Sequence, residues 1–298
     1  MSSQSAPAAS RFVAHIDPAA LAADRKRAVA AALAEDVGSG DVTASLVGDH
    51  EVAKARVIVR ESAVLCGSAW FDAVMCAVDA TIRIEWLAKD GDVVEQDQKL
   101  CSINGPARAI LTAERAALNF LQTLSGTATT THRYAQEVAG TGCRLLDTRK
   151  TIPGLRLAQK YATAIGGAKN HRIGLYDALL IKENHIASTG SIAAAIARAR
   201  TDHAALPIEI EVESIDEMRT ALDCGVERIL LDNFSTDALR EAVAINRAHA
   251  QPAELEASGG IEQTGLRNIA ETGVDFISIG ALTKHLQATD FSMRFVFS

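Results

Sequence analysis

The sequence has few aromatic residues and few cysteines, and each shortage excludes a class of protein. Aromatic residues make up 4% of the chain, which argues against the stacking platforms that bind single-stranded nucleic acid. The five cysteines are odd in number and include no Cys-x-x-Cys pair, so neither a disulfide framework nor a zinc knot is expected. We expect buried thiols in a reducing compartment, the cytoplasm, and a catalytic cysteine is the weaker alternative.

The chain also lacks long apolar runs and an excess of positive charge. No uninterrupted apolar stretch reaches the roughly 18 residues of a membrane span. The opening MSSQSAPAAS is small and polar, so residues 1–11 are expected to form a disordered tail. The formal net charge is -7 and the pI is about 5.6, so no general attraction to nucleic acid or to an anionic membrane is expected.

Apolar residues make up 48% of the 298 residues, enough for a large core, and they follow two patterns. In residues 12–124, a helix capped by Asp17 is followed by alternating stretches that predict strands at 55–60, 81–87 and 99–103. Residues 90–103 are similar to the hairpin of biotinyl or lipoyl carrier domains. A carrier domain and a small structural β-fold both explain this likeness. Lys89 and Lys99 lack the tight-turn setting of a modified lysine, which favours the structural β-fold.

The second pattern alternates strands and helices about every 20 residues. Strands are predicted at 145–147, 178–181, 209–212, 228–232, 254–257 and 274–280, with helices at 214–224, 235–249 and 264–271. Ser214 and Glu217 form the expected capping box of the first of these helices, and Gly225 ends it. Successive βα units predict a parallel sheet, either barrel-like or doubly wound.

Polar or glycine-rich segments follow five of the predicted strands, where the active sites of βα barrels lie. These segments are 147–150 (DTRK), 182–185 (KENH), 232–233 (DN), 258–260 (SGG) and 280–281 (GA). Glu209, Glu211 and Glu213 alternate with aliphatic residues, so we expect them to point inward and to be paired by lysines or a substrate-borne Mg²⁺. An edge strand with a solvated acidic face is the alternative.

Residues 149–182 carry seven basic side chains and a single acidic one, in a chain that is acidic as a whole. A solvated basic face is the usual explanation of such a run. Here the charges are interleaved with glycines and flank predicted strand ends, and arginine offers a planar fork to carboxylate or phosphate. The residues therefore predict a barrel-like site for a multiply anionic small molecule, with acids placed to hold a divalent metal such as Mg²⁺.

Several ordered motifs resemble those of the quinolinate phosphoribosyltransferase family. They run from about residue 33 to 284: EDVG (35–38), GDVT (40–43), ERAALN (114–119), DTRKTIPGLR (147–156), GAKNHRIGL (167–175), LIKENH (180–185), EIEVE (209–213), LDNF (231–234), EASGGI (256–261) and SIGALT (278–283). Long motifs in a fixed order are far more specific than a single glycine fingerprint.

The resemblance implies a fold, a reaction and an assembly. The fold is an N-terminal α/β sandwich domain at residues 12–124, joined by 284–298, with an open seven-stranded α/β barrel at 125–283. The reaction joins quinolinate and phosphoribosyl pyrophosphate with Mg²⁺ and yields nicotinate mononucleotide, pyrophosphate and CO₂ in NAD biosynthesis. Members are homodimers or larger oligomers.

Residue roles carry over position by position. The quinolinate carboxylates are implied to bind Arg149, His171, Arg172 and Lys182, with Arg115 entering the site of the other subunit. Catalytic roles at the ribose, pyrophosphate and metal are implied for Lys150, Glu211 and Asp232, the last two as metal ligands. The phosphate side is implied to comprise Thr148, Ser258, Gly259, Gly260, Ile279, Gly280 and Ala281.

Two rival enzymes remain beside this interpretation. A Schiff-base aldolase would use Lys182 as its amine, but it leaves the other basic residues without a task. A related phosphoribosyltransferase would take a different acceptor, although five groups suited to carboxylates favour a dicarboxylate over nicotinate.

Overall fold

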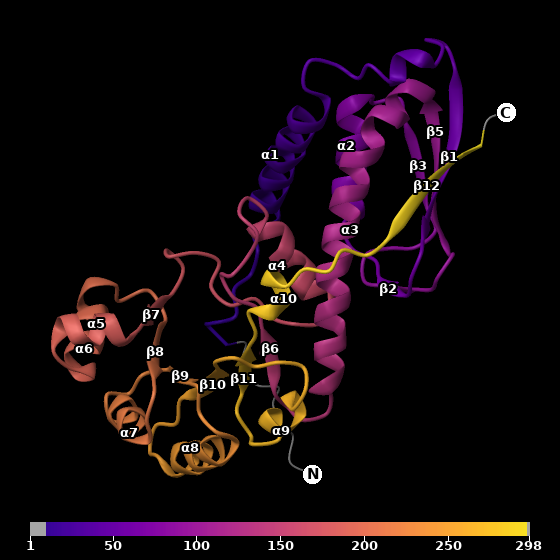
Figure 1. Ribbon diagram of the computed structural model, residues 1–298. Coiled ribbons are helices and arrows are strands. Elements are labelled where there is room, and N and C mark those ends of the chain that lie inside the picture. Colours follow the sequence, from indigo (N-terminus) through magenta and orange to yellow (C-terminus); the bar gives the residue numbers. More distant parts are fainter. Residues whose placement is uncertain (1–9, 297–298) are drawn as a thin grey trace, which may run out of the picture. The chain divides into compact units, whose positions relative to one another are not determined.

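A computed structural model describes residues 10–296, which fall into two compact units. The barrel unit consists of the residues up to His15, Tyr134–Arg149 and Ala168–Gly280. The sandwich unit consists of Ile16–Arg133, Lys150–Gly167 and the residues from Ala281 on. Figure 1 shows the elements of both.

The sandwich unit contains an antiparallel four-stranded sheet in the order β12-β1-β5-β3. Its strands are β1 (Val52–Val59), β3 (Arg83–Trp86), β5 (Lys99–Pro106) and β12 (Phe291–Val296), and β2 (Ala63–Val64) pairs separately with β4 (Val93–Val94). In β1 exposed and buried residues alternate, so one face of the strand packs on the core. All three strands predicted in this stretch are confirmed, within a few residues.

Helices supply the rest of the core of the sandwich unit. They are α1 (Pro18–Val37), α2 (Ser68–Val78), α3 (Ala107–Glu137), α4 (Arg156–Ile165) and α10 (Ala281–Lys284), with a 3₁₀ turn, η1, at Ala44–Leu46. Asp17 caps α1 as predicted, because its carboxylate accepts from the backbone N–H groups of Ala19 and Ala20. Trp70 and Phe71 of α2 are fully buried in the apolar cluster between these helices and the sheet.

The barrel unit is built on a parallel sheet in the order β6-β11-β10-β9-β8-β7. The strands are β6 (Arg144–Leu146), β7 (Leu179–Ile181), β8 (Ile208–Val212), β9 (Arg228–Asp232), β10 (Glu254–Ser258) and β11 (Phe276–Ser278). Each predicted strand of this stretch is confirmed, and βα repetition explains why they are parallel. The two end strands, β6 and β7, leave the barrel open.

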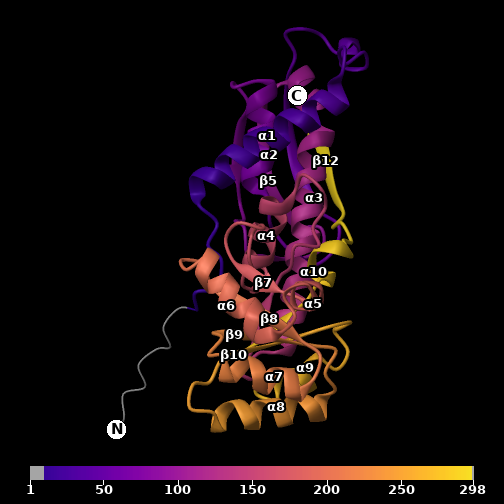
Figure 2. The ribbon, with the colours of Figure 1, turned by 90° about the vertical axis from the view of Figure 1, so that its left-hand side faces the viewer.

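Helices cover the outer side of this sheet. They are α5 (Glu183–Thr189), α6 (Ile192–Asp202), α7 (Ile215–Asp223), α8 (Thr236–Ala248) and α9 (Leu266–Ala270), and Figure 2 shows α7 and α8 beside β8–β10. Ser214 caps α7 by accepting from the backbone N–H of Glu217, as the capping box predicts. The Glu217 carboxylate reaches the N–H of Glu213, one residue earlier than that motif prescribes.

One expectation of the architecture differs from the structure. Within residues 10–296 the parallel sheet has six strands and not seven, since the segment at Lys169 adds only a single parallel bridge to Leu146. The predicted domain boundary at residues 124 and 125 lies within α3, which is one continuous helix, and residues 150–167 belong to the sandwich unit.

The expected tail falls mostly on residues 1–9, which lie outside the described residues. Ser10 and Arg11 are described, and both contact the barrel unit: Ser10 hydrogen-bonds Glu254, and Arg11 pairs with Glu227. Ser10 and Arg11 are therefore not part of a disordered tail. Among residues 10–296, no helix is long and apolar enough to cross a membrane.

Candidate functional site

The parallel register gathers the predicted polar segments at one edge of the barrel sheet. Ser258, the last residue of β10, lies opposite Asp232, the last residue of β9. Thr148 and Arg149 follow β6, Lys182 follows β7, and Ile279 and Gly280 follow β11. Since the strands run parallel, all of these residues lie at their carboxyl ends, where α/β barrels bind ligands.

Three cationic side chains of this edge, Arg149, Arg172 and Lys182, line one cavity of about 840 Å³. Other lining residues come from α5, α6 and the strand β7, with Leu179 and Leu180 among the apolar ones. The cavity belongs entirely to the barrel unit. Its composition, an apolar wall with a few convergent cations, suits a small flat anion.

Arg172 is half-buried and close to a like charge. Burial lowers the pKa of its guanidinium, and the cation of Arg149 lowers it further. Its Nη1 donates to the carbonyl of Ala178 at 3.2 Å, which holds one end of the fork. Two guanidinium groups that repel each other in a half-buried cavity are stabilised when an anion enters between them.

Lys182 and two acids form a second group at the same edge. The Nζ of Lys182 contacts the carboxylate of Glu211 on the adjacent strand β8. Asp232 accepts a hydrogen bond from the side-chain amide of Asn233 at 2.7 Å. The register pairs Glu211 with Leu230, two residues before Asp232, so the two carboxylates are on the same face of neighbouring strands.

Glu211 and Asp232 fit Mg²⁺ only together with further ligands from a substrate. The cluster of described residues whose atoms lie close enough to hold a metal by themselves is His171, Glu209 and Glu256, and it includes neither Glu211 nor Asp232. Mg²⁺ is commonly held by one or two carboxylates together with substrate phosphates and waters. Glu211 and Asp232 therefore suit a metal that arrives with a pyrophosphate.

The turn after β10 brings backbone close to the end of β9. Gly259 has φ +101°, and a Cβ there would lie 2.2 Å from Oδ1 of Asn233, so a side chain does not fit. The backbone N–H of Asn233 donates to the carbonyl of Ser258 at 2.9 Å and fixes this close approach. The Ser258–Gly260 turn is thus a narrow, backbone-lined part of the edge.

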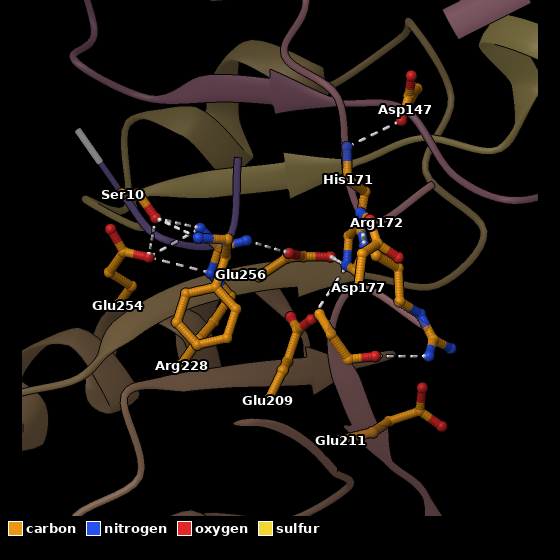
Figure 3. A network of polar contacts seen from close by, with 12 residues as sticks. Ser10, Asp147, His171, Arg172, Asp177, Glu209, Glu211, Arg228, Glu254 and Glu256 are labelled. Carbon is orange, nitrogen blue, oxygen red and sulfur yellow. Dashed lines mark hydrogen bonds and ion pairs between the residues drawn. The ribbon is translucent and has the colours of Figure 1, made fainter. Parts of the chain in front are cut away.

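The barrel unit also holds a network of buried charges (Figure 3). The Nε2 of His171 lies 3.0 Å from the carboxylate of Glu209 and 3.6 Å from that of Glu256. Burial raises the pKa of Glu256 to about 7, and the nearby Glu209 carboxylate adds to this effect. Glu209 keeps a lowered pKa, because the contacts with His171 and the charge of Arg228 outweigh its burial.

Arg228 supplies the fixed positive charge of this network. It is fully buried, with Nη2 at 2.7 Å from Glu254 and Nη1 at 3.4 Å from Glu256. Its guanidinium lies over the rings of Phe12 and Phe276, with 4.5 and 4.1 Å to the ring centroids. Figure 3 shows Glu256 between Arg228 and His171.

The expectation that a lysine pairs an inward glutamate holds for Glu211, which contacts Lys182. Glu209 instead contacts His171 and is near the charge of Arg228, and Glu213 is exposed just beyond the end of β8. β8 pairs with both β7 and β9, so the alternative of an edge strand is wrong. Sequence reasoning missed Arg228 and Glu256, although Glu254 and Glu256 alternate with apolar residues on β10 as the glutamates of β8 do.

Three of the predicted site residues belong to the sandwich unit. Arg115 is exposed on α3, Ala281 is the first residue of α10, and the carbonyl of Lys150 accepts a hydrogen bond from Thr283 at 2.7 Å. The other predicted site residues, from Thr148 to Gly280, belong to the barrel unit.

The chain matches two family models over most of its length. Residues 127–294 match the model described as quinolinate phosphoribosyl transferase, C-terminal domain, and residues 41–125 match that of the N-terminal domain. A Synechocystis protein described as a probable carboxylating nicotinate-nucleotide pyrophosphorylase is 39% identical, covering 89% of this chain and 90% of that protein. A chloroplastic Arabidopsis thaliana protein of the same name is 37% identical and covers 91% and 82%.

Solved structures give the same result. The nicotinate-nucleotide pyrophosphorylase from Francisella tularensis is similar with a TM-score of 0.89 and 45% identity, covering 92% of this chain and 96% of that one. A human nicotinic acid phosphoribosyltransferase, with 12% identity and a TM-score of 0.63, covers 92% and 73% and shares the fold alone.

Proposed function

Because the chain belongs to the quinolinate phosphoribosyltransferase family, we propose that the cavity of Arg149, Arg172 and Lys182 binds the two carboxylates of quinolinate. The reaction of the chain is phosphoribosyl transfer from phosphoribosyl pyrophosphate to quinolinate, with loss of CO₂, giving nicotinate mononucleotide and pyrophosphate. This is the carboxylating nicotinate-nucleotide pyrophosphorylase step of NAD biosynthesis.

The observation that carries the proposal is that the three predicted anion-binding cations Arg149, Arg172 and Lys182 line one cavity. Quinolinate has two adjacent carboxylates on a flat ring, so it needs more than one cation, and arginine offers a bidentate fork. Burial and the neighbouring cation of Arg149 lower the pKa of Arg172, and binding a dianion relieves the repulsion between the two guanidinium groups. The apolar residues of β7 suit the face of the pyridine ring.

The phosphate side of the site is proposed at the glycine-rich strand ends. Thr148, the Ser258–Gly260 turn and the Ile279–Gly280 segment offer backbone N–H groups and hydroxyls at the edge of the sheet. The roles that the family resemblance implies for Lys150 and Ala281 stay predictions. Glu211 and Asp232 would hold Mg²⁺ together with the pyrophosphate, and the metal would supply charge neutralisation of the leaving group.

The protein's task in this chemistry is to hold anions in place. The pyridine nitrogen attacks the anomeric carbon, the bond to pyrophosphate breaks, and positive charge develops on the ribose ring. We propose that Glu211 and Asp232 stabilise that charge or orient the ribose hydroxyls. The quaternary pyridinium then accepts the electron pair of the carbon–carbon bond that breaks as CO₂ leaves. No protein nucleophile is required.

The contact of Lys182 with Glu211 also bears on the Schiff-base alternative. A Schiff base needs the Lys182 nitrogen to be available for attack on a carbonyl, whereas Nζ contacts the Glu211 carboxylate and Lys182 lines the same cavity as Arg149 and Arg172. This contact supports the role of Lys182 as an anion-binding cation.

We propose that the protein is a homodimer and that it is located in the cytoplasm. Arg115 is exposed on α3, which agrees with a role in the site of the other subunit of a homodimer. All five cysteines are free thiols, which agrees with a reducing, cytoplasmic location.

The test is an assay of the purified protein with quinolinate, phosphoribosyl pyrophosphate and Mg²⁺, following the loss of quinolinate absorbance and the release of CO₂. Nicotinate serves as the parallel acceptor. Turnover with quinolinate alone supports the proposed substrate, whereas turnover only with another acceptor overturns it.

A variant tests the residue assignment in the same assay. Arg172→Lys keeps the charge and loses the fork, so KM for quinolinate should rise about 10- to 100-fold, as expected for a lost charge-assisted hydrogen bond. KM for phosphoribosyl pyrophosphate should stay within about twofold. Arg240→Lys, an exposed arginine of α8 paired with Asp237, is the matched control. Equal effects on both substrates would contradict the assignment of Arg172.

A further inference from the structure

The imidazole of His171 has protein partners at both of its ring nitrogens. Its Nε2 faces the carboxylates of Glu209 and Glu256, and its Nδ1 accepts a hydrogen bond from the backbone N–H of Arg172 at 2.7 Å. The side chain is only 10% exposed. A ring held in this way has neither nitrogen directed at a ligand in the cavity.

The pattern of donors and acceptors defines the protonation state of the ring. Nδ1 can accept from Arg172 only when it carries a lone pair, so the proton of the neutral ring is on Nε2, where it points at the carboxylates. A second proton would have to go on Nδ1 and would place two N–H donors 2.7 Å apart. Turning the ring over would leave carbon atoms facing both partners.

Two electrostatic effects oppose each other at this ring. Burial lowers the pKa of His171, and the charges of Glu209 and Glu256 outweigh burial and raise it. The added proton, however, costs the hydrogen bond to Arg172 and leaves that backbone N–H without its acceptor. The contact at Nδ1 favours the neutral ring, because Nδ1 is already occupied as the acceptor of the Arg172 N–H, while the one proton on Nε2 faces Glu209 and Glu256.

We propose that His171 is a positioning residue: in its neutral, Nε2-protonated form it is anchored by Glu209 and Glu256 and holds the backbone N–H of Arg172. It thereby sets the direction of the Arg172 guanidinium in the cavity and does not itself bind the carboxylates of the substrate. The identity of that substrate rests on the proposed function above.

The rest of the segment around Arg172 is fixed in a matching way. Asp147 accepts from the backbone N–H of His171 at 2.9 Å and from the side-chain amide of Asn170 at 2.6 Å. The carboxylate of Asp177 accepts from the backbone N–H groups of Ile173 and Gly174 at 2.6 and 2.9 Å. In the sequence, Arg172 lies between the residues held by Asp147 and those held by Asp177. The His171 ring connects the backbone N–H of Arg172 to the buried acids Glu209 and Glu256. Arg228 in turn anchors Glu256.

Two substitutions separate positioning from direct binding. In His171→Asn the side-chain oxygen replaces Nδ1 and retains an acceptor for Arg172, whereas in His171→Gln the amide reaches toward Glu209 and the acceptor near Arg172 is lost. We expect KM for quinolinate to rise less than about threefold in His171→Asn and on the order of tenfold in His171→Gln, the loss of one hydrogen bond. KM for phosphoribosyl pyrophosphate should not change in either variant. If His171 instead bound quinolinate directly as a cation, both variants would lose that charge. Equal losses of quinolinate binding in the two variants would therefore overturn the proposal.

A second measurement needs neither substrate nor turnover. In the ¹⁵N spectrum of the histidine-labelled wild-type enzyme at neutral pH, the signals that disappear in His171→Asn should show one protonated and one unprotonated ring nitrogen. Two protonated nitrogens would overturn the proposal, and so would a stoichiometric divalent metal bound by His171, Glu209 and Glu256 in the purified protein. The expected spectrum in a protein that does not turn over quinolinate would overturn the proposed function and not the role of His171.

Discussion

Replacing Arg228 by methionine should destabilise the protein strongly and in a pH-dependent way. Methionine fills much of the volume between the Phe12 and Phe276 rings, but it removes the cation beside Glu256. Glu254 is partly exposed and stays solvated, whereas Glu256 is fully buried and is left beside the charge of Glu209. Breaking a buried ion pair from one side costs about 3–5 kcal/mol, so the free energy of unfolding should fall by about that amount.

The dependence on pH follows from the position of Glu256. Its pKa is already about 7 with Arg228 present, and loss of that cation raises it further. At pH 6 the Glu256 carboxyl of the variant takes up a proton, so no charge is buried. At pH 8 the same protonation costs more free energy. The destabilisation should therefore be larger at pH 8 than at pH 6.

A double-mutant cycle isolates the interaction. Arg228→Met, Glu256→Gln and the double variant are unfolded in urea beside the wild type. Far-UV circular dichroism is the suitable probe, because both tryptophans, Trp70 and Trp86, belong to the sandwich unit and report poorly on the barrel unit. The double variant should lose about 2 kcal/mol less than the sum of the single losses. Strict additivity, or a loss under about 1 kcal/mol in Arg228→Met, would refute the assignment of Arg228 as the counter-charge of Glu256.

Three further predictions concern single residues. Glu256 has a pKa raised from 4.5 to about 7, so its contribution to stability is full below 4.5 and is lost as the pH rises through 7. Glu256→Gln has no carboxyl to ionise and lacks this loss. From pH 5 to pH 8, its free energy of unfolding relative to that of the wild type should therefore rise by on the order of 3 kcal/mol, as measured by denaturation at both pH values. Gly126→Ala would place a Cβ 2.1 Å from the backbone oxygen of Gln287, so tryptophan fluorescence in urea should show a loss of about 1–3 kcal/mol; an unchanged midpoint would contradict this contact. Gly259→Ala combines a positive φ with a clash against Asn233, and KM for phosphoribosyl pyrophosphate should rise while KM for quinolinate stays constant.

Much of the barrel unit could be predicted because its signals are local. The strand Arg228–Asp232 was predicted to the residue, and the caps at Asp17 and Ser214 follow from side chains that reach backbone N–H groups two or three residues away. The position of Lys182 and Asp232 at strand ends needs only the strand boundaries and the rule that parallel strands end at one edge.

Domain membership and strand count could not be predicted in the same way. Residues 150–167 follow a barrel strand in the sequence, yet α4 packs in the core of the sandwich unit through Ala158 and Ala162. The seventh strand is reduced to one bridge at Lys169, because the segment after it is held by side chains of Asp147 and Asp177 and not by a ladder.

The sequence by itself determined which residue types stand at the strand ends: cations after β6 and β7, acids on β8 and β9, and glycines after β10 and β11. Period-two alternation is a local property, so it also determined that the glutamates of β8 share a face. Only the tertiary structure decided their partners. The register of β8, β9 and β10 brings Glu209, Arg228 and Glu256 beneath His171. The charge on each of these groups depends on the others at a few ångströms in a dry interior, and that proximity is created by folding.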